Sequence, residues 1–182
     1  MLILGSKSPR RKEILSSVGI DFKVIIKEVE EDISCNDYLE YPKLTAIKKA
    51  NALIDEVSDE DCILCCDTIV YINDSILGKP HNKSEAYEMI KLLQGNSHYV
   101  VTGVFLGNKK KSYTFSVATK VTVSKMCEDE ILEYINTSEP YDKAGGYAIQ
   151  GIFGKFIESI DGDYYNVVGL PINSIYKYLK EF

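Results

Sequence analysis

The sequence predicts an α/β protein with a mixed β-sheet, and two observations support this fold class. Short apolar or alternating segments, which are typical of strands, are interspersed along the whole chain with segments whose apolar residues follow helical spacing. The 182 residues are 45% hydrophobic and 26% charged, which is typical of a folded chain long enough to bury a core. We therefore expect residues 1–182 to form a single domain.

The first third of the chain predicts two strands and two helices. Ser8 is a good helix N-cap, Pro9 suits the first helical position, and Gly19 closes the helix that they begin. A second helix follows from apolar residues at helical spacing. The remaining expected elements are strands at Leu2–Gly5 and Phe22–Ile26 and the second helix at Leu44–Val57.

The rest of the chain continues the mixture of strands and helices. Asn82 and Glu85 resemble a capping box, and the helix that they begin ends at Gly95. Another helix begins at Glu128, where acidic residues favour the first turn. The expected strands are Cys62–Cys66 and Ile69–Ile72, separated by Asp67-Thr68, then an antiparallel pair at Tyr99–Leu106 and Phe115–Val123, and a strand within Tyr164–Pro171 that leads into a last helix at Ile172–Leu179.

Charge and cysteine content exclude several classes of function. The formal net charge of -6 does not suit broad binding to a nucleic-acid backbone, although a local cationic pocket can still bind a small anion. We expect no membrane-spanning helix, because no segment is long enough, and no secretory signal, because the positive charges follow the short apolar N-terminus. Five cysteines indicate a reducing cytosol, and Cys62-x-x-Cys65 fits a buried strand better than a redox or zinc site.

The turn after the first predicted strand is a candidate anion site. Ser6, Ser8, Arg10 and Arg11 stand at a helix N-terminus, where free amides and guanidinium groups can bind phosphate. An ordinary capped helix with a solvated basic first turn explains the same residues equally well. An anion partner would relieve the cost of basic groups at the positive end of the helix dipole.

Three further clusters carry groups suited to phosphate and metal chemistry. Asp67 follows a buried strand, a common place for a metal ligand or general base, although Asp also forms turns. Lys79, in Gly-Lys-Pro, could meet a phosphate, but the segment is not a Walker motif. Glu30 and Glu31 could supply an oxygen ligand for magnesium, or could simply be a solvated acidic loop.

A glycine-rich segment, Asp142 to Gly151, is the last candidate. Its glycines let the backbone approach a ligand closely, Lys143 could contact phosphate, and the Gln150 amide could read the edge of a nucleobase. The competing interpretation is an ordered surface loop without chemistry. Neither a nucleophilic triad nor a dinucleotide-binding motif appears in the chain.

Taken in order, these motifs resemble the Maf family of nucleotide pyrophosphatases. The matching segments are S-K-S-P-R-R, C-D-T-I-V, G-K-P, D-K-A-G-G-Y-A-I-Q-G and Y-Y-N-V-V-G-L-P, and the likeness runs from Leu4 to Leu179. The resemblance implies a two-lobed α/β fold with a long mixed sheet flanked by helices and a central cleft, similar in shape to the inosine triphosphate pyrophosphatases. It also implies hydrolysis between the α- and β-phosphates of a nucleotide with Mg²⁺ or Mn²⁺.

The resemblance also assigns roles to individual residues. The position of Asp67 is that of the family's proton acceptor, and Asp67 and Glu31 would bind the metal. The positions lining the cleft would be Ser8, Arg11, Glu31, Lys49, Lys79 and Gln150. With Lys143 from the glycine-rich segment, the expected substrate or phosphate ligands are Ser8, Arg11, Lys49, Lys79 and Lys143. The positions that distinguish the branch acting on dTTP and UTP, with modified pyrimidines as further candidates, are Arg10, Thr68 and Gln150.

The family resemblance implies a cytoplasmic homodimer that removes unwanted nucleotides from the pool, without nucleic-acid or membrane partners. Two alternatives stay open at this point. One is a purine-selective pyrophosphatase acting on ITP, XTP or 7-methyl-GTP, and the other is a non-catalytic, nucleotide-binding regulator of septum formation. The chain departs from the family pattern at Lys7, Cys66, Gly146 and Ala148 and in a short segment before Lys49. None of these departures removes a proposed catalytic group, but the altered glycine loop and the short segment could shift the base preference.

Overall fold

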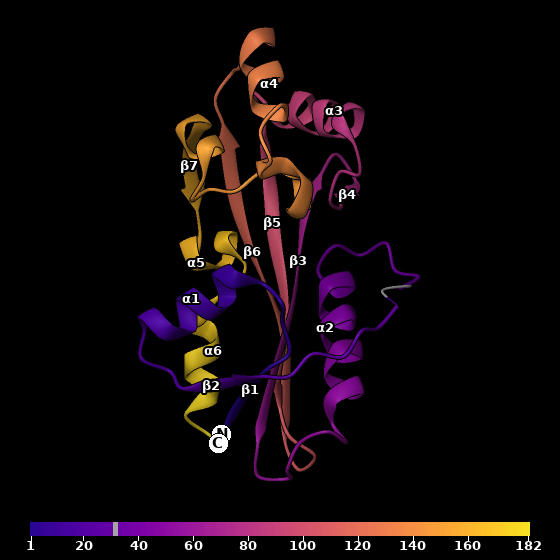
Figure 1. Ribbon diagram of the computed structural model, residues 1–182, viewed down its shortest axis with the longest axis vertical. Helices are drawn as coiled ribbons and strands as arrows, with labels where there is room; N and C mark the ends of the chain where they lie inside the picture. Colours follow the sequence, from indigo (N-terminus) through magenta and orange to yellow (C-terminus); the bar gives the residue numbers. More distant parts are fainter. Residues whose placement is uncertain (31–32) are drawn as a thin grey trace. The chain divides into compact units, whose positions relative to one another are not determined.

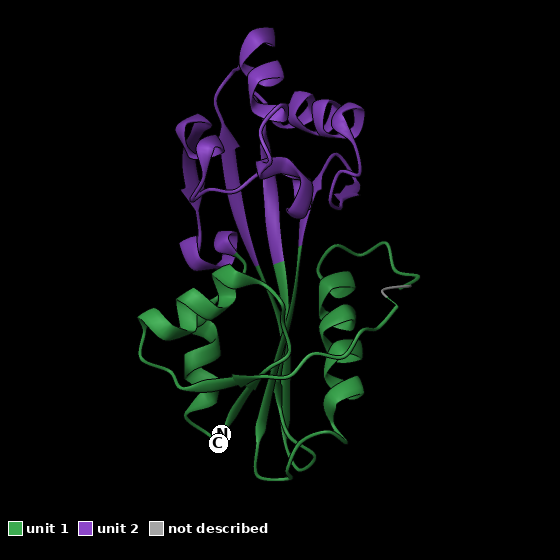
Figure 2. Cartoon of the chain, in the orientation of Figure 1, with its two compact units in different colours: residues 1–68, 102–117, 169–182 green, residues 69–101, 118–168 purple. Residues whose placement is uncertain are grey.

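The computed structural model describes residues 1–30 and 33–182 and divides into two compact units. Unit 1 comprises residues 1–68, 102–117 and 169–182, and unit 2 comprises residues 69–101 and 118–168 (Figure 2). The two units correspond to the two predicted lobes. The cleft between the lobes and the single-domain organisation stay predictions.

Within the described residues, the strands form one mixed seven-stranded sheet in the order β2-β1-β3-β5-β6-β7, with β4 paired to β3. The N-terminal strand β1 runs parallel to both β2 and β3, whereas β4 is antiparallel to β3 and β7 is antiparallel to β6. The predicted mixed sheet is therefore confirmed. The strands are β1 (Leu2–Leu4), β2 (Phe22–Val24), β3 (Cys62–Ile72), β4 (Ser75–Leu77), β5 (Ser97–Gly107), β6 (Ser112–Val123) and β7 (Ile157–Asp161).

Unit 1 carries helices α1 (Pro9–Ser17), α2 (Glu40–Leu53) and α6 (Ile172–Leu179). In Figure 1, α1 and α6 lie on one face of the unit 1 strands and α2 lies on the other. The backbone of α2 comes so close to β5 that a Cβ on Gly103 would lie 2.1 Å from the Lys43 nitrogen. Only glycine permits this approach, which brings the inner face of α2 against the sheet.

Helix α2 begins about one turn earlier than the sequence predicts. The Asp37 carboxylate accepts hydrogen bonds from the backbone N–H groups of Leu39 at 2.8 Å and Glu40 at 3.2 Å, and so satisfies donors at the helix start. Its apolar side packs onto the sheet in a cluster of buried residues: Ala46, Ala50, Leu53, Ile63, Cys65 and Phe105. This packing places the flank of α2 beside the middle of β3.

Unit 2 carries helices α3 (Lys83–Leu93), α4 (Glu128–Ile135) and α5 (Tyr164–Val168), and the short helices η1 (Glu139–Asp142), η2 (Ala144–Gly146) and η3 (Ile152–Phe156). Helix α3 packs against α4 and η2. The predicted start of α3 is confirmed, because Asn82 Oδ1 accepts from the Glu85 N–H at 2.9 Å. Glu85 Oε2 accepts from the His81 backbone N–H at 2.9 Å, and its Oε1 accepts from the Asn82 side-chain amide at 3.0 Å.

Two predicted elements differ from the structure. Asp67 and Thr68 do not interrupt a strand but lie inside β3, which runs unbroken from Cys62 to Ile72. The segment expected to contain a strand before the last helix instead forms α5. Asp163 Oδ1 accepts from the Tyr165 N–H at 2.8 Å, which is the capping bond that starts this helix despite its strand-favouring residues.

Candidate active site

Asp67 and Lys49 form a largely enclosed ion pair in unit 1. Lys49 extends from the flank of α2, and its Nζ lies 2.8 Å from Asp67 Oδ1 in β3. The two side chains are only 20% and 14% exposed, so their attraction is less screened by solvent than a surface pair would be. The structure thus brings together two side chains, 18 positions apart, that the sequence had assigned to one site.

Arg11 connects three segments around Asp67. Its Nε donates to the Gly169 carbonyl at 2.8 Å, and its Nη1 donates to the Cys66 carbonyl at 2.9 Å and to Ser6 Oγ at 3.0 Å. Its Nη2 donates to Thr68 Oγ1 at 3.0 Å. Since a guanidinium has five N–H groups, one N–H on Nη2 is left without an acceptor among the described residues. Arg11 therefore brackets Asp67 from both sides along β3 and keeps one donor for a ligand.

The turn between β1 and α1 is organised by Ser6 rather than by Ser8. The buried Ser6 hydroxyl accepts from the Ser8 N–H at 3.2 Å and from Arg11, whereas the Ser8 side chain, though at the N-cap position, makes no capping hydrogen bond. Arg10 is half-buried in the first turn of α1. The start of α1 therefore combines unsatisfied backbone donors with the Ser8 hydroxyl and two arginines, which is a suitable environment for an anion.

Thr68 links the Arg11 bracket to the neighbouring strand. Its Oγ1 lies 2.9 Å from Oγ1 of Thr102 in β5, a threonine that is completely buried. Gly169 completes this side of the site with φ of +114°, a conformation that favours glycine, and a Cβ there would lie 3.5 Å from Thr68 Oγ1. The sequence analysis did not assign roles to Thr102 or Gly169, because a threonine in an apolar strand is indistinguishable from an ordinary strand former.

The three cysteines before Asp67 are structural. Cys62, Cys65 and Cys66 are free and buried in β3, and burial raises the pKa of their thiols to about 11, about 12 and about 11, respectively. Because the thiolate is the reactive form, these side chains are poor nucleophiles near neutral pH. Their burial agrees with the interpretation of the Cys-x-x-Cys segment as a buried strand.

The remaining described candidates belong to unit 2. Lys79 is exposed in the turn after β4, and Gln150 is exposed before η3. Lys143 is more enclosed: its Nζ donates to the Glu139 carbonyl at 2.9 Å and contacts the Asp142 carboxylate. The Gly145 N–H donates to the Gly78 carbonyl at 2.9 Å, so the turn of Lys79 and the loop of Lys143 are joined directly.

The loop that carries Lys143 and Gln150 is held mainly through its backbone. The Glu139 carboxylate accepts from the N–H of Ile152 at 2.7 Å and of Phe153 at 3.1 Å, which closes the loop at its base. The buried Tyr134 hydroxyl donates to the Gly146 carbonyl at 3.0 Å. These bonds fix the path of the main chain and leave the Gln150 side chain in solvent.

A buried histidine anchors the same loop. His98 Nε2 lies 2.6 Å from the hydroxyl of Tyr147, whereas its Nδ1 is buried without a hydrogen-bond partner. Burial lowers the pKa of His98 to about 4, so the imidazole is neutral at physiological pH. A neutral, enclosed imidazole of this kind supports loop structure rather than acid–base chemistry.

No cluster of three or more His, Cys, Asp or Glu side chains suited to a metal ion occurs among residues 1–30 and 33–182. Glu31, the second expected ligand, lies outside the described residues. Of the two expected metal ligands, the described residues therefore contain Asp67, whose carboxylate lies in β3. This fits Mg²⁺, which proteins commonly bind through one or two carboxylates together with substrate phosphates, better than a metal held in an all-protein cage.

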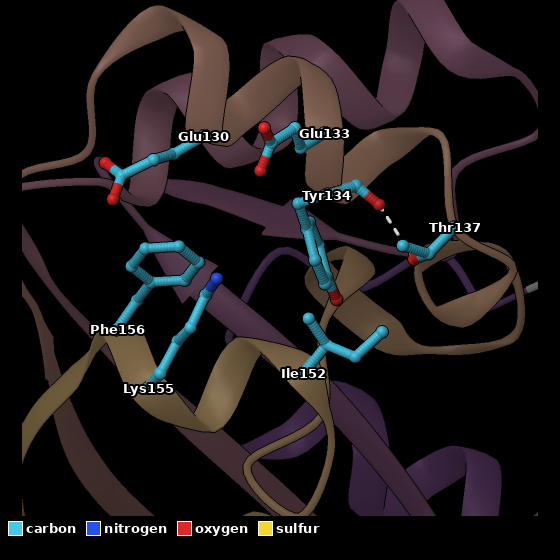
Figure 3. A pocket seen from close by; sticks show the side chains of 7 residues that line it. All are labelled: Glu130, Glu133, Tyr134, Thr137, Ile152, Lys155 and Phe156. Atoms are coloured by element: carbon cyan, nitrogen blue, oxygen red, sulfur yellow. Dashed lines mark hydrogen bonds between the residues drawn. The ribbon is translucent and has the colours of Figure 1, made fainter.

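A pocket in unit 2 contains none of the predicted site residues. It lies between α4 and η3 and is lined in part by Glu130, Glu133, Tyr134, Lys155 and Phe156 (Figure 3). Lys155 Nζ lies 4.8 Å from the centre of the Phe156 ring. Of its two glutamates, Glu130 caps the start of α4 by accepting from the Cys127 N–H at 2.8 Å. Because the pocket contains none of the residues that the family resemblance implies, the candidate active site is the one in unit 1.

The sheet and its flanking helices place the protein in a known class of α/β fold. The structure of the Staphylococcus aureus Ham1 protein superposes with a TM-score of 0.57 over 99% of this chain and 98% of that chain. The two sequences are only 14% identical, so the likeness concerns the fold. In the described part of the chain, no helix is both long and apolar enough to span a membrane.

The chain belongs to the Maf-like protein family, whose sequence profile matches residues 1–182. A dTTP/UTP pyrophosphatase of Clostridium botulinum (strain Eklund 17B / Type B) is 46% identical, covering 99% of this chain and 98% of the relative. Proteins of the same name from Bacillus anthracis (strain CDC 684 / NRRL 3495) and Thermoanaerobacter sp. (strain X514) are 46% and 44% identical, covering 100% and 98% of this chain and 95% of each relative. The predicted family is confirmed.

Proposed function

We propose that the protein is a nucleoside triphosphate pyrophosphatase that hydrolyses dTTP and UTP to the monophosphate and pyrophosphate. The observation that carries the proposal is the enclosed Asp67–Lys49 pair, bracketed by Arg11, in a chain whose full-length relatives bear the name dTTP/UTP pyrophosphatase. A carboxylate surrounded by fixed cations suits phosphoryl chemistry, where charge neutralisation and positioning supply most of the catalysis.

In the proposed reaction, Asp67 orients and deprotonates a water molecule directed at the α-phosphorus, with pyrophosphate as the leaving group. Lys49 is 2.8 Å from that carboxylate, and it holds the carboxylate in place and adds positive charge beside the reacting phosphate. The start of α1, with Ser8 and the remaining Arg11 donor, binds phosphate oxygens. A bound Mg²⁺ or Mn²⁺, with Asp67 and Glu31 as its proposed protein ligands, supplies charge neutralisation at the phosphate oxygens.

The other assignments belong to the same proposal and rest on the family. Lys79 and Lys143 are proposed phosphate ligands, and Arg10, Thr68 and Gln150 are proposed specificity residues. The exposed Gln150 amide supports a recognition role, because it can both donate to and accept from a pyrimidine edge. The homodimer, the cytoplasmic location and the role in clearing unwanted nucleotides are proposed on the same basis.

A nucleotide panel tests the proposal. Pyrophosphate release is measured from dTTP, UTP, CTP, GTP, 7-methyl-GTP, ITP and ATP, with Mg²⁺ or Mn²⁺ and after metal removal by chelation. We expect release from dTTP and UTP that disappears on chelation. Pyrophosphate release from ITP or 7-methyl-GTP alone would support the pyrophosphatase reaction but contradict the proposed preference for pyrimidine nucleotides. Nucleotide binding without release from any member would favour the septum regulator instead.

A further inference from the structure

Thr102 is a buried polar residue beside the candidate active site to which neither the family resemblance nor the sequence analysis gives a role. It lies in β5, next to β3 in the sheet, and has no exposed surface. Its Oγ1 is 2.9 Å from that of Thr68, the residue after Asp67. Burying a hydroxyl is costly unless it is hydrogen-bonded, and the contact with Thr68 contributes to meeting this requirement.

The contact between the Thr102 and Thr68 hydroxyls also affects which hydrogen bonds Thr68 can make. A threonine hydroxyl has one hydrogen to donate and two positions at which to accept. Thr68 Oγ1 already accepts from Arg11 Nη2 at 3.0 Å, and the contact with Thr102 takes a second position. If the Thr102 hydroxyl donates to Thr68, the Thr68 hydroxyl can still donate its own hydrogen to another acceptor. If the Thr68 hydroxyl donates to Thr102, Thr68 can only accept a further hydrogen bond. Thr102 thereby sets whether Thr68 presents a donor or an acceptor.

The same contact supports the Arg11 bracket. Arg11 spans from Gly169 to the carbonyl of Cys66 and to Thr68, the two residues that flank Asp67 in β3. Since the guanidinium is planar and its donors are fixed in direction, a rotation of the Thr68 side chain would remove one of its four anchors. The 2.9 Å contact between the Thr102 and Thr68 hydroxyls would oppose such a rotation.

We propose that Thr102 is a positioning residue for nucleotide hydrolysis, which acts through the hydroxyl of Thr68 on the Arg11 guanidinium beside Asp67. The inference rests on the proposed function and requires no contact between Thr102 and the substrate. If the role of Thr102 were purely structural, its substitution would change the stability of the fold but not the rate of hydrolysis. The two roles differ in whether the hydroxyl, rather than the volume of the side chain, sets the rate.

Two substitutions separate the hydroxyl from the volume. Thr102→Val keeps the shape and removes the hydroxyl, and Thr102→Ser keeps the hydroxyl and removes the methyl group. We expect Thr102→Val to lower kcat for dTTP about tenfold with a smaller change in KM, since the lost hydrogen bond misaligns groups used in the reaction. Thr102→Ser is expected to stay within about threefold of the parent.

A matched control and a double substitution complete the test. Thr45→Val removes another buried threonine hydroxyl of unit 1, which donates to the Tyr41 carbonyl 3.0 Å away within α2, and should lower the melting temperature without lowering kcat. In a Thr68→Val background, Thr102→Val should cause little further loss, because the two residues act in series. Thr102→Ala provides a second hydroxyl-free variant if Thr102→Val does not fold.

The kinetic measurements distinguish failure of this inference from failure of the proposed function. Parental kcat and KM in folded Thr102→Val or Thr102→Ala would overturn the positioning role and leave the proposed function intact. Equal losses of kcat in Thr102→Val and Thr102→Ser, or fully additive losses with Thr68→Val, would do the same. A parent protein that releases no pyrophosphate from any nucleotide would overturn both.

Discussion

The catalytic candidate Asp67 in unit 1 and the specificity candidate Gln150 in unit 2 are held in opposite ways. In unit 1 the functional side chains themselves are fixed: Asp67 is paired with Lys49, and Arg11 makes four hydrogen bonds to its surroundings. In unit 2 the backbone of the loop is fixed, through Glu139 and neighbouring groups, whereas the Gln150 side chain is exposed.

This difference matches two kinds of requirement. Transition-state stabilisation needs charges that are already oriented, because reorganisation during the reaction costs free energy. Recognition of one base among several tolerates side chains that adjust to their ligand, provided that the segment carrying them keeps its position. We therefore propose that the chemical step depends on the fixed side chains of unit 1, and that Gln150 in the loop of unit 2 contributes to base recognition together with Arg10 and Thr68 of unit 1.

Matched substitutions of two lysines test this division with the largest expected contrast. Lys49→Met removes the partner of an enclosed carboxylate and should lower kcat about a hundredfold, with a lower melting temperature. Lys79→Met alters an exposed lysine and should raise KM for dTTP about tenfold, with little change in kcat or melting temperature. Steady-state kinetics and thermal unfolding of both variants measure these effects. Equal changes in kcat and KM in the two variants would contradict the division.

A smaller effect concerns the anchor of the unit 2 loop. Burial lowers the pKa of His98 from its ordinary value of 6.5 to about 4, so between these pH values the unfolded chain binds more protons than the folded one. Stability from the neutral imidazole is therefore complete above pH 6.5 and is lost as pH falls towards 4, by up to about 3 kcal/mol.

Denaturant unfolding between pH 4 and pH 7 measures the His98 contribution. The parent and a variant of the exposed histidine, His81→Gln, should share the same loss of stability at low pH. The loss should be smaller in His98→Gln, whose amide does not gain a proton in this range. An unchanged pH dependence in His98→Gln would show that other groups cause the loss.

The helices were predicted more accurately from the sequence than the strands that contain polar residues. Helices α3, α4 and α6 follow from apolar spacing and capping signals, which depend on neighbouring residues alone. The unbroken course of β3 was missed because Asp67-Thr68 resembles a turn, whereas pairing with neighbouring strands keeps it extended. The α5 helix was missed because its tyrosines and valines favour strands, although Asp163 offered a capping signal.

The site was predictable wherever a motif supplied charged groups. The family resemblance assigned Asp67, Lys49 and Arg11 to one site, and the structure places these three side chains close together in unit 1; their roles stay predictions. The hydrogen bonding of the segment between β1 and α1 was not predicted. The sequence indicated Ser8 as the helix cap, whereas the Ser6 hydroxyl accepts the hydrogen bonds from Ser8 and Arg11. Thr102 could not be found at all, since its role depends on which strands are neighbours in the sheet.

The most direct test of the central claim is a single-turnover measurement of pyrophosphate release from dTTP, with protein in excess, in the parent and in Asp67→Asn. The account predicts a fall in rate of about 10² to 10⁴ in a protein that still folds and binds nucleotide, with a lower melting temperature because the enclosed Lys49 loses its carboxylate partner. Asp74→Asn, at the exposed turn before β4, serves as the matched control and should keep the parental rate. A folded Asp67→Asn protein that releases pyrophosphate at the parental rate would contradict the assignment of Asp67 as the catalytic base.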